Sequence, residues 1–280
     1  YTEAVLKVGH DWGEWMIKQM PTTQSTGIME RVCSVCSSVE DKDVAKLDPS
    51  LNPAPVDPMP DPGTGGGSGG GGGAPAPTFP DVDYSESSWY GEAVTYVTGK
   101  GLITGYTSGD KAGQFGVGDT LTRAQLATIL WRNACPDEYA SYDPETAKDT
   151  TGIDGSADGM YYTAAANWAV KNGVITGFDR EDGSKDFAAD ENVSFEQLIT
   201  ILSRLCAIPD ELAAAGSDLS AFADGDLASD WSRSAFAWAA KKGLVEGYDW
   251  PTGKYLVPGE DVARERVAVV LKRAFEMGIM

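Results

Sequence analysis

The sequence predicts a mainly α protein in which three helix-loop-helix repeats pack into one pseudo-threefold body, preceded by a small β-rich module on a disordered linker. The segment from Gly101 to Arg132 recurs from Gly173 to Arg204 and again from Gly243 to Arg273. Each copy joins a Gly-aliphatic-aliphatic-x-Gly-aromatic turn to a Gly/Asp-rich loop and then to an apolar run at helical spacing. Self-similarity at a nearly fixed spacing is the signature of a repeat architecture.

Changes in composition along the 280-residue chain give the expected domain organisation. We expect a small module at 1–48, a linker at 49–78 and repeats (copies 1, 2 and 3) at 79–140, 141–210 and 211–280. The linker is proline-rich and then Gly/Ser-rich, which favours an extended and then a flexible chain without a packed core.

The overall charge limits the possible partners. The net charge is −20 at pH 7, and nucleic-acid phosphates require basic patches, so we expect no nucleic-acid partner. No apolar run approaches the roughly 20 residues that span a bilayer, so we expect no membrane insertion. Because the chain begins at Tyr1 without a Met, we expect a fragment or a mature form. The last predicted helix leaves no room for a C-terminal sorting tail.

The N-terminal module contains a close cysteine pair. Cys33 and Cys36 form a Cys-x-x-Cys motif, and His10 is the single histidine of the chain. A structural zinc site normally has four ligands and the fourth is missing here, so a disulfide or a free pair is the alternative to zinc. Loose alternation at residues 14–18 and 29–35 predicts one or two short hairpins.

This module resembles small repeat modules of Gram-positive surface proteins. In those modules a GHxWGEW stretch, here GHDWGEW from Gly9 to Trp15, alternates with a Cys-x-x-Cys strand. The modules usually carry a further cysteine, and Thr23 stands at that place. We therefore assign no metal to the chain.

Each copy opens with a first helix. In copy 1, Trp89, Ala93, Tyr96 and Val97 fall on one helical face. The helix should end at Gly101, since glycine readily adopts the positive φ of a helix C-terminus. Gly173 and Gly243 hold the same place in the other copies, and an aromatic residue stands twelve positions before each glycine, at Trp89, Tyr161 and Trp231.

The second helix of each copy has its own start signal. Thr122 to Gln125 and Ser194 to Gln197 read as capping boxes. Ala263 to Arg266 lacks both halves, so that helix start should be weaker by about 1 kcal/mol. The predicted buried stripe is Leu126, Ile129 and Leu130 in copy 1, Leu198, Ile201 and Leu202 in copy 2, and Val267, Val270 and Leu271 in copy 3. Arg132, Arg204 and Arg273 share one position in the last turn, where a cation suits the helix dipole.

Two arginines suggest an anion site. Arg123 and Arg264 stand at the first position of their predicted helices, where unpaired N–H groups already present positive charge. A guanidinium beside such N–H groups suits a carboxylate ligand. The alternative is an arginine that reaches a neighbouring aspartate. In copy 2 the position holds Phe195, so that site should lack the charge.

A glycine-aromatic pair follows in every copy: Gly105 and Tyr106, Gly177 and Phe178, and Gly247 and Tyr248. An aromatic ring beside bare backbone suits the face of a sugar. Packing under the loop explains these pairs equally well.

Together these motifs resemble the S-layer homology domain. They are the Phe-x-Asp signals at Phe79 and Phe222, the Gly-Leu-Ile-x-Gly-Tyr turn, and Leu-Thr-Arg-Ala-Gln from Leu121, where the family signature is Thr-Arg-Ala-Glu. The resemblance covers residues 79–280 and implies three repeats with grooves between neighbours. In this family such grooves bind secondary cell-wall polysaccharide, commonly through a pyruvyl-ketal carboxylate. The candidate ligand-binding residues are Arg123, Arg264, Gly105, Gly177, Gly247, Tyr106, Tyr248, Trp89 and Trp231. We expect two competent sites and one degenerate site.

Two further features are explained by structure alone, without a bound metal or a disulfide. The loop from Asp179 to Asp186 has acidic residues but no twelve-residue calcium pattern, so a turn is the better prediction than calcium. Cys135 and Cys206 fall near equivalent positions of two helices. They could form a disulfide in an exported protein, but buried free thiols are the favoured interpretation.

We therefore predict a non-catalytic, extracellular wall anchor. Its expected partner is secondary cell-wall polysaccharide, with peptidoglycan as a further candidate, and no cofactor is expected. A His-dependent triad is excluded from the repeats because His10 lies beyond the linker. The alternatives are the anchor fragment of a wall-active hydrolase and a self-assembling S-layer subunit.

Overall fold

The N-terminal segment forms a three-stranded antiparallel sheet in the order β1-β2-β3, which confirms the predicted hairpins. Its strands are β1 (Met16–Gln19), β2 (Gly27–Val32) and β3 (Val39–Val44). The computed structural model describes residues 16–19, 27–33, 37–44, 78–206, 209–250 and 252–280. Two compact units divide at residue 52, and each is described by itself.

The cysteine motif of this sheet is only partly described. Cys33 is buried directly after β2. Cys36, His10 and the linker residues 49–77 lie outside the described residues, so the zinc and disulfide alternatives stay open.

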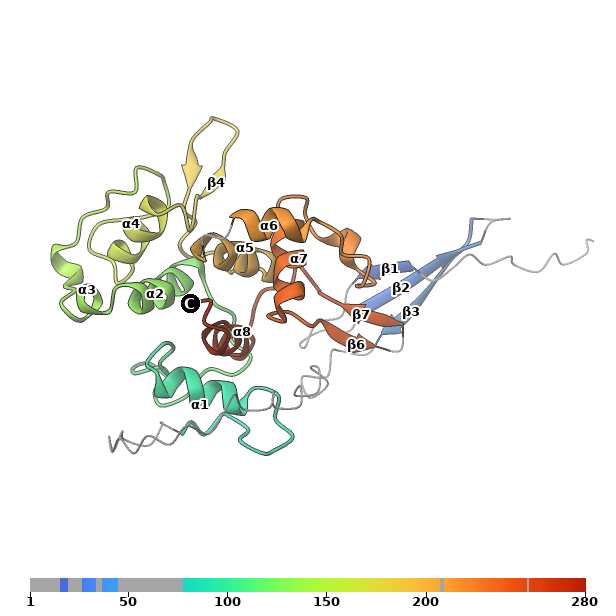
Figure 1. The fold of residues 1–280 in the computed structure, drawn as a ribbon, viewed down its shortest axis with the longest axis horizontal. Helices are drawn as coiled ribbons and strands as arrows, with labels where there is room; N and C mark the ends of the chain where they lie inside the picture. Colours follow the sequence, from blue (N-terminus) through green and yellow to red (C-terminus); the bar gives the residue numbers. More distant parts are fainter. Residues whose placement is uncertain (1–15, 20–26, 34–36, 45–77, 207–208, 251) are drawn as a thin grey trace, which may run out of the picture. The chain divides into compact units, whose positions relative to one another are not determined.

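The second unit is mainly helical, with two small hairpins (Figure 1). Its α-helices are α1 (Gly91–Gly99), α2 (Arg123–Ala134), α3 (Pro136–Ala140), α4 (Thr163–Lys171), α5 (Phe195–Leu205), α6 (Pro209–Ala215), α7 (Arg233–Lys242) and α8 (Arg264–Glu276). The hairpin strands are β4 (Phe178–Asp179) with β5 (Lys185–Asp186), and β6 (Tyr248–Trp250) with β7 (Gly253–Tyr255); 3₁₀ turns span Pro144–Thr146 and Gly225–Leu227.

The second helix of each copy packs against the first helix of the next copy. Helix α2 packs on α4, α5 on α7, and α8 returns to α1 (Figure 1). Each of these second helices therefore contacts a first helix from a different segment of the sequence.

A closed ring of backbone hydrogen bonds joins the three segments that lead into the second helices. Leu121 N donates to Val262 O at 3.2 Å, Val262 N to Val193 O at 2.8 Å, and Val193 N to Leu121 O at 2.9 Å. All three side chains are buried. Isolated antiparallel bridges extend the ring between Thr120 and Ala263 and at the equivalent pairs of the other interfaces.

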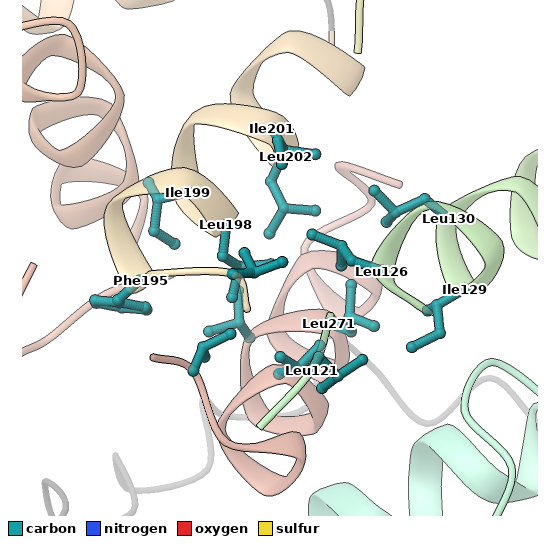
Figure 2. Close-up of a cluster of buried hydrophobic side chains, with 14 of the residues drawn as sticks. Leu121, Leu126, Ile129, Leu130, Phe195, Leu198, Ile199, Ile201, Leu202 and Leu271 are labelled. Carbon is teal, nitrogen blue, oxygen red and sulfur yellow. The ribbon is translucent and has the colours of Figure 1, made fainter. Parts of the chain in front are cut away.

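The three residues of this ring belong to the hydrophobic core, part of which is drawn in Figure 2. The predicted stripe of the second helices is confirmed, because all nine of its aliphatic residues are buried. Figure 2 shows side chains of α2 and α5 converging with Leu271 of α8. On α1, Ala93 and Val97 are buried as expected and Tyr96 is half-buried against the core. Trp89 was expected on this helix but precedes it, because α1 begins at Gly91; its side chain is half-buried against the core.

The helix ends follow the sequence signals in part. Gly101, Gly173 and Gly243 have positive φ, as predicted. The capping box is complete at Thr122 and Gln125. At Ser194 only half of the box forms: Ser194 Oγ accepts from Gln197 N at 3.3 Å, while Gln197 Oε1 is buried without a partner.

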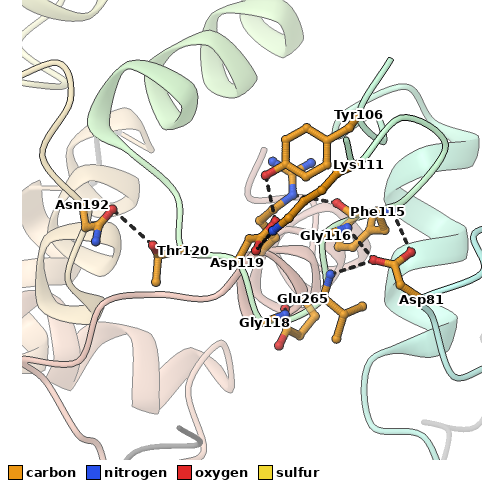
Figure 3. A network of polar contacts seen from close by, with 12 residues as sticks. Asp81, Tyr106, Lys111, Phe115, Gly116, Gly118, Asp119, Thr120, Asn192 and Glu265 are labelled. Atoms are coloured by element: carbon orange, nitrogen blue, oxygen red, sulfur yellow. Dashed lines mark hydrogen bonds and ion pairs between the residues drawn. The ribbon is translucent and has the colours of Figure 1, made fainter. Parts of the chain in front are cut away.

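The aspartate of the Phe-x-Asp signal holds the loop before the second helix by hydrogen bonds to its backbone (Figure 3). Asp81 accepts hydrogen bonds from the backbone N–H groups of Phe115, Gly116 and Val117 at 2.7 to 3.0 Å. Burial opposes ionisation, but these three bonds outweigh it and lower the pKa of Asp81. In copy 3, Asp224 accepts from Leu256 N and Val257 N, both at 2.7 Å, but its burial outweighs these bonds and raises its pKa.

Copy 2 has Gly155 at the position of this aspartate, and the carboxylate of Asp186 takes over its role. A Cβ added to Gly155 would lie 1.9 Å from Asp186 Oδ1, so the Asp186 carboxylate occupies that space, and it accepts from Ala188 N at 2.8 Å. Asp186 also pairs with Arg180. The loop from Asp179 to Asp186 is a hairpin in which Asp179 pairs with Lys185 and Asp186 with Arg180, which confirms the predicted turn.

The two helix-terminal cysteines are both free and half-buried, so the predicted thiols are confirmed and the disulfide alternative is not formed. Burial raises the pKa of Cys206 to about 11, and it also raises the pKa of Cys135.

The turn glycines make room for the Phe-x-Asp aromatic. A Cβ on Gly105 would lie 2.2 Å from Phe79 Cε1 and 2.7 Å from Gln114 O. A Cβ on Gly247 would lie 2.9 Å from Phe222 Cε1, whereas a Cβ on Gly177 would lie 3.0 Å from Ile153 Cδ1; both glycines have a φ of +75°. Packing is therefore sufficient to explain these glycines.

We expect Gly105→Ala to lower the free energy of unfolding by about 1 to 3 kcal/mol, since the added methyl group overpacks against Phe79. Urea unfolding followed by circular dichroism measures the effect. Gly259→Ala is the matched control because nothing lies within 4 Å of its added Cβ. Equal unfolding midpoints for the two variants would contradict the packing explanation.

Candidate functional site

Arg123, the first residue of α2, reaches across into copy 2. Its Nε donates to Phe187 O at 2.7 Å, and its guanidinium lies 4.3 Å from the ring centroid of Phe178. The residue is 4% exposed. Burial lowers the pKa of Arg123 to about 10, so it stays cationic at neutral pH.

Arg264, the first residue of α8, makes the equivalent contacts with copy 1. Its Nε donates to Phe115 O at 2.8 Å and its Nη2 to Thr104 O at 2.9 Å. The guanidinium lies 4.8 Å from the ring centroid of Tyr106. Burial lowers the pKa of Arg264. Both arginines thus donate to carbonyls of a neighbouring copy, instead of pairing with an aspartate.

The backbone N–H groups at these helix starts are already occupied. Arg123 N donates to Glu191 O at 2.9 Å, Arg264 N to Asp119 O at 2.9 Å, and Phe195 N to Glu260 O at 2.8 Å. The first amide of each of these helices is therefore not free to bind a ligand, whereas the guanidinium groups remain candidates for an anion site.

The interface that holds Phe195 also contains a guanidinium, contrary to expectation. Arg266, two residues after Arg264, lies 3.5 Å from the ring centroid of Phe195 and 4.7 Å from that of Tyr248. Its Nη2 donates to Leu256 O at 3.0 Å. Phe195 itself is 2% exposed and packs on Phe236.

The predicted aromatic residues have different environments. Tyr106 donates from its hydroxyl to Asp119 Oδ2 at 3.1 Å (Figure 3), and burial raises its pKa. Tyr248 is 5% exposed, and burial raises its pKa to about 12. Trp231 is half-exposed, whereas Trp89 packs against the core with its Nε1 buried and without a partner. The structure brings Tyr106 to Arg264 and Tyr248 to Arg266, but places neither tryptophan beside them.

A pocket of about 460 Å³ lies along α2, and Arg264 is part of its wall. Its other lining residues are Ile103, Thr104, Gln125, Thr128, Ile129, Arg132, Tyr139, Ala140, Tyr142, Pro144 and Tyr161. The described lining thus contains two guanidinium groups and three tyrosines, and no carboxylate. In a chain of net charge −20, this concentration of positive charge is unusual.

Arg132 is the pocket residue that the sequence analysis assigned only to the helix dipole. Its guanidinium lies 4.7 Å from the ring centroid of Tyr139, its Nε is buried without a partner, and Nη1 makes a long 3.5 Å contact with Gly101 O. The equivalent Arg273 pairs with Glu246 at 3.1 Å. Copy 1 has Thr104 where copy 3 has Glu246, and this difference was visible in the aligned repeats.

A second pocket, of about 500 Å³, lies beside Phe178 near Arg123. Its lining includes Asp186, Asp190 and Glu191, which would repel an anion. The α2 pocket is therefore the better of the two for a negatively charged ligand.

Comparison with known proteins shows what part of the chain is similar to. Residues 78–127 match the family model of the S-layer homology domain. The surface-layer 125 kDa protein of Lysinibacillus sphaericus is 28% identical over 195 residues, which cover 69% of this chain and 15% of that protein. The amylopullulanase of Thermoanaerobacterium thermosulfurigenes is 24% identical over 194 residues, which cover 69% of this chain and 9% of that enzyme. The chain thus spans a small part of the length of these curated relatives.

These comparisons confirm the predicted extracellular location at the cell surface. Among the helices that the structure describes, each is too short or too polar to span a bilayer.

We expect Arg264→Ala to lower the free energy of unfolding by about 1 to 3 kcal/mol, because two carbonyls lose their donors. Chemical denaturation of the purified chain measures the loss. Arg132→Ala serves as the comparison and should change stability by less than about 0.5 kcal/mol, since its contacts are long and half-exposed. If Arg264→Ala unfolds at the wild-type denaturant concentration, its interface contacts are not stabilising.

Proposed function

We propose that residues 79–280 form three tandem S-layer homology repeats, at 79–140, 141–210 and 211–280, arranged around a pseudo-threefold axis. The ring of backbone bonds through Leu121, Val193 and Val262 supports this arrangement, because each residue precedes the N-cap of an equivalent helix. The cyclic packing of α2 on α4, α5 on α7 and α8 on α1 supports it independently.

We propose that this body anchors a surface protein to the cell wall by binding an anionic secondary cell-wall polysaccharide. The observation that carries the proposal is the α2 pocket, with Arg132, Arg264 and three tyrosines and no described carboxylate. Guanidinium groups bind carboxylates in a bidentate manner, and tyrosine rings offer flat faces and hydroxyl groups to a sugar. A sugar that carries a pyruvyl ketal combines both features.

The acidity of the whole chain does not oppose such binding. Charges on distant surfaces are screened beyond about 8 Å at physiological ionic strength. A half-buried guanidinium acts on a ligand at contact distance, where screening is weak. The local charge of the pocket therefore decides the interaction.

The two relatives favour two ways of using the anchor. The surface-layer relative favours a structural subunit, and the amylopullulanase favours an anchor joined to an enzyme. In both cases we propose that the repeats are non-catalytic. Release of sugar from wall polymer by the purified chain would refute this part of the proposal.

Arg132→Ala should weaken binding to purified cell-wall polysaccharide at least tenfold, because it removes a charged donor worth about 1.5 to 3 kcal/mol. Isothermal titration calorimetry measures the affinity. Arg204→Ala is the matched control, since it removes the same charge from the same helix position in copy 2, and Arg204 does not line the pocket. Equal losses for both variants would point to a general charge effect and against the pocket.

Mild acid treatment of the walls, which removes ketal groups, should abolish most of the binding of the wild-type chain. Pull-down on treated and untreated walls measures the difference. Undiminished binding to treated walls would leave peptidoglycan or a ketal-free polymer as the ligand.

A further inference from the structure

The interface between copies 2 and 3 differs from the other two in the origin of its guanidinium. At the other interfaces the first residue of a second helix, Arg123 or Arg264, reaches into the next copy and donates to a carbonyl. Here that residue is Phe195, and the equivalent carbonyl, Leu256 O, accepts from Arg266 of its own copy. The Phe195 ring takes the space of the missing arginine and lies against the Arg266 guanidinium.

At this third interface, a carboxylate of the protein itself forms an ion pair with the guanidinium. Arg266 Nη1 donates to Glu260 Oε2 at 3.0 Å, and the two side chains are 9% and 11% exposed. Asp119 and Glu191 hold the position equivalent to Glu260, because each accepts the first amide of a second helix through its carbonyl. Asp119 instead binds Lys111 and Tyr106, and Glu191 is exposed.

The buried guanidinium depends on this carboxylate. Breaking a buried ion pair by removing one partner leaves an uncompensated charge, which strongly destabilises the fold. A small external carboxylate can satisfy the same charge if it reaches the same place. Gly259, next to Glu260, is exposed, and nothing lies within 4 Å of a Cβ added to it, so the ion pair lies beside an open part of the surface.

We propose that the third interface is an anion-binding site occupied by the protein's own Glu260 carboxylate. Arg266 is its receptor, Phe195 and Tyr248 are its aromatic walls, and a small carboxylate is the class of ligand it accepts once Glu260 is removed. In the intact chain this interface takes no external anion. The consequence that glycan reaches only the other interfaces rests on the proposed function, whereas the chemistry of the site does not.

Chemical rescue of the full chain tests this inference. Glu260→Ala should lower the melting temperature, and sodium acetate should raise it by roughly 2 to 4 °C more than sodium chloride of equal ionic strength. If Glu260→Ala is unfolded at 25 °C, recovery of its circular dichroism signal by acetate is the same result. A melting temperature or signal that responds equally to acetate and chloride overturns the proposal.

Two variants show that the effect belongs to this site. Glu191→Ala removes the equivalent but exposed acid of copy 2 and should show no acetate-specific rise. Glu260→Ala/Arg266→Met removes the receptor as well and should lose the acetate response; a response that persists overturns the assignment to Arg266. A wild-type chain that binds no wall glycan would refute the proposed function but would leave the acetate result unaffected.

Discussion

The ring of backbone hydrogen bonds through Leu121, Val193 and Val262 is the constraint on which the second unit depends. It fixes the entry of three helices at one point, and it occupies backbone groups that burial would otherwise leave without partners. Each of these helices then packs on a helix of the next copy. The positions that frame the interfaces, including Arg123 and Arg264, are held by this arrangement.

The three interfaces use the same carbonyl acceptor but differ in charge and access. Arg264 lies in the wall of the α2 pocket, where Arg132 adds a second guanidinium without a carboxylate partner. Near Arg123 the adjacent pocket is acidic. At the third interface Arg266 is neutralised by Glu260. Small differences in the loops thus turn one architecture into three electrostatic environments.

The binding that we propose and the folding of the protein depend on some of the same side chains. The guanidinium of Arg264 joins copies 3 and 1 and also lines the pocket, so its loss affects both properties. Arg132 separates them, because its contacts within the protein are weak. In the proposed anchor, groups that the fold already holds in place would lose little entropy when a polysaccharide binds.

The sequence alone determined the features that depend on near neighbours in the chain. The repeats, the apolar stripes, the positive φ of Gly101 and the complete cap at Thr122 follow from periodicity and local hydrogen bonding. Only the tertiary structure decided which carbonyls and rings the arginine side chains contact. Phe115 O lies 149 residues from Arg264, and the occupied helix-start amides likewise depend on carbonyls of other copies. Such contacts arise from the packing of distant segments, which local pattern does not specify.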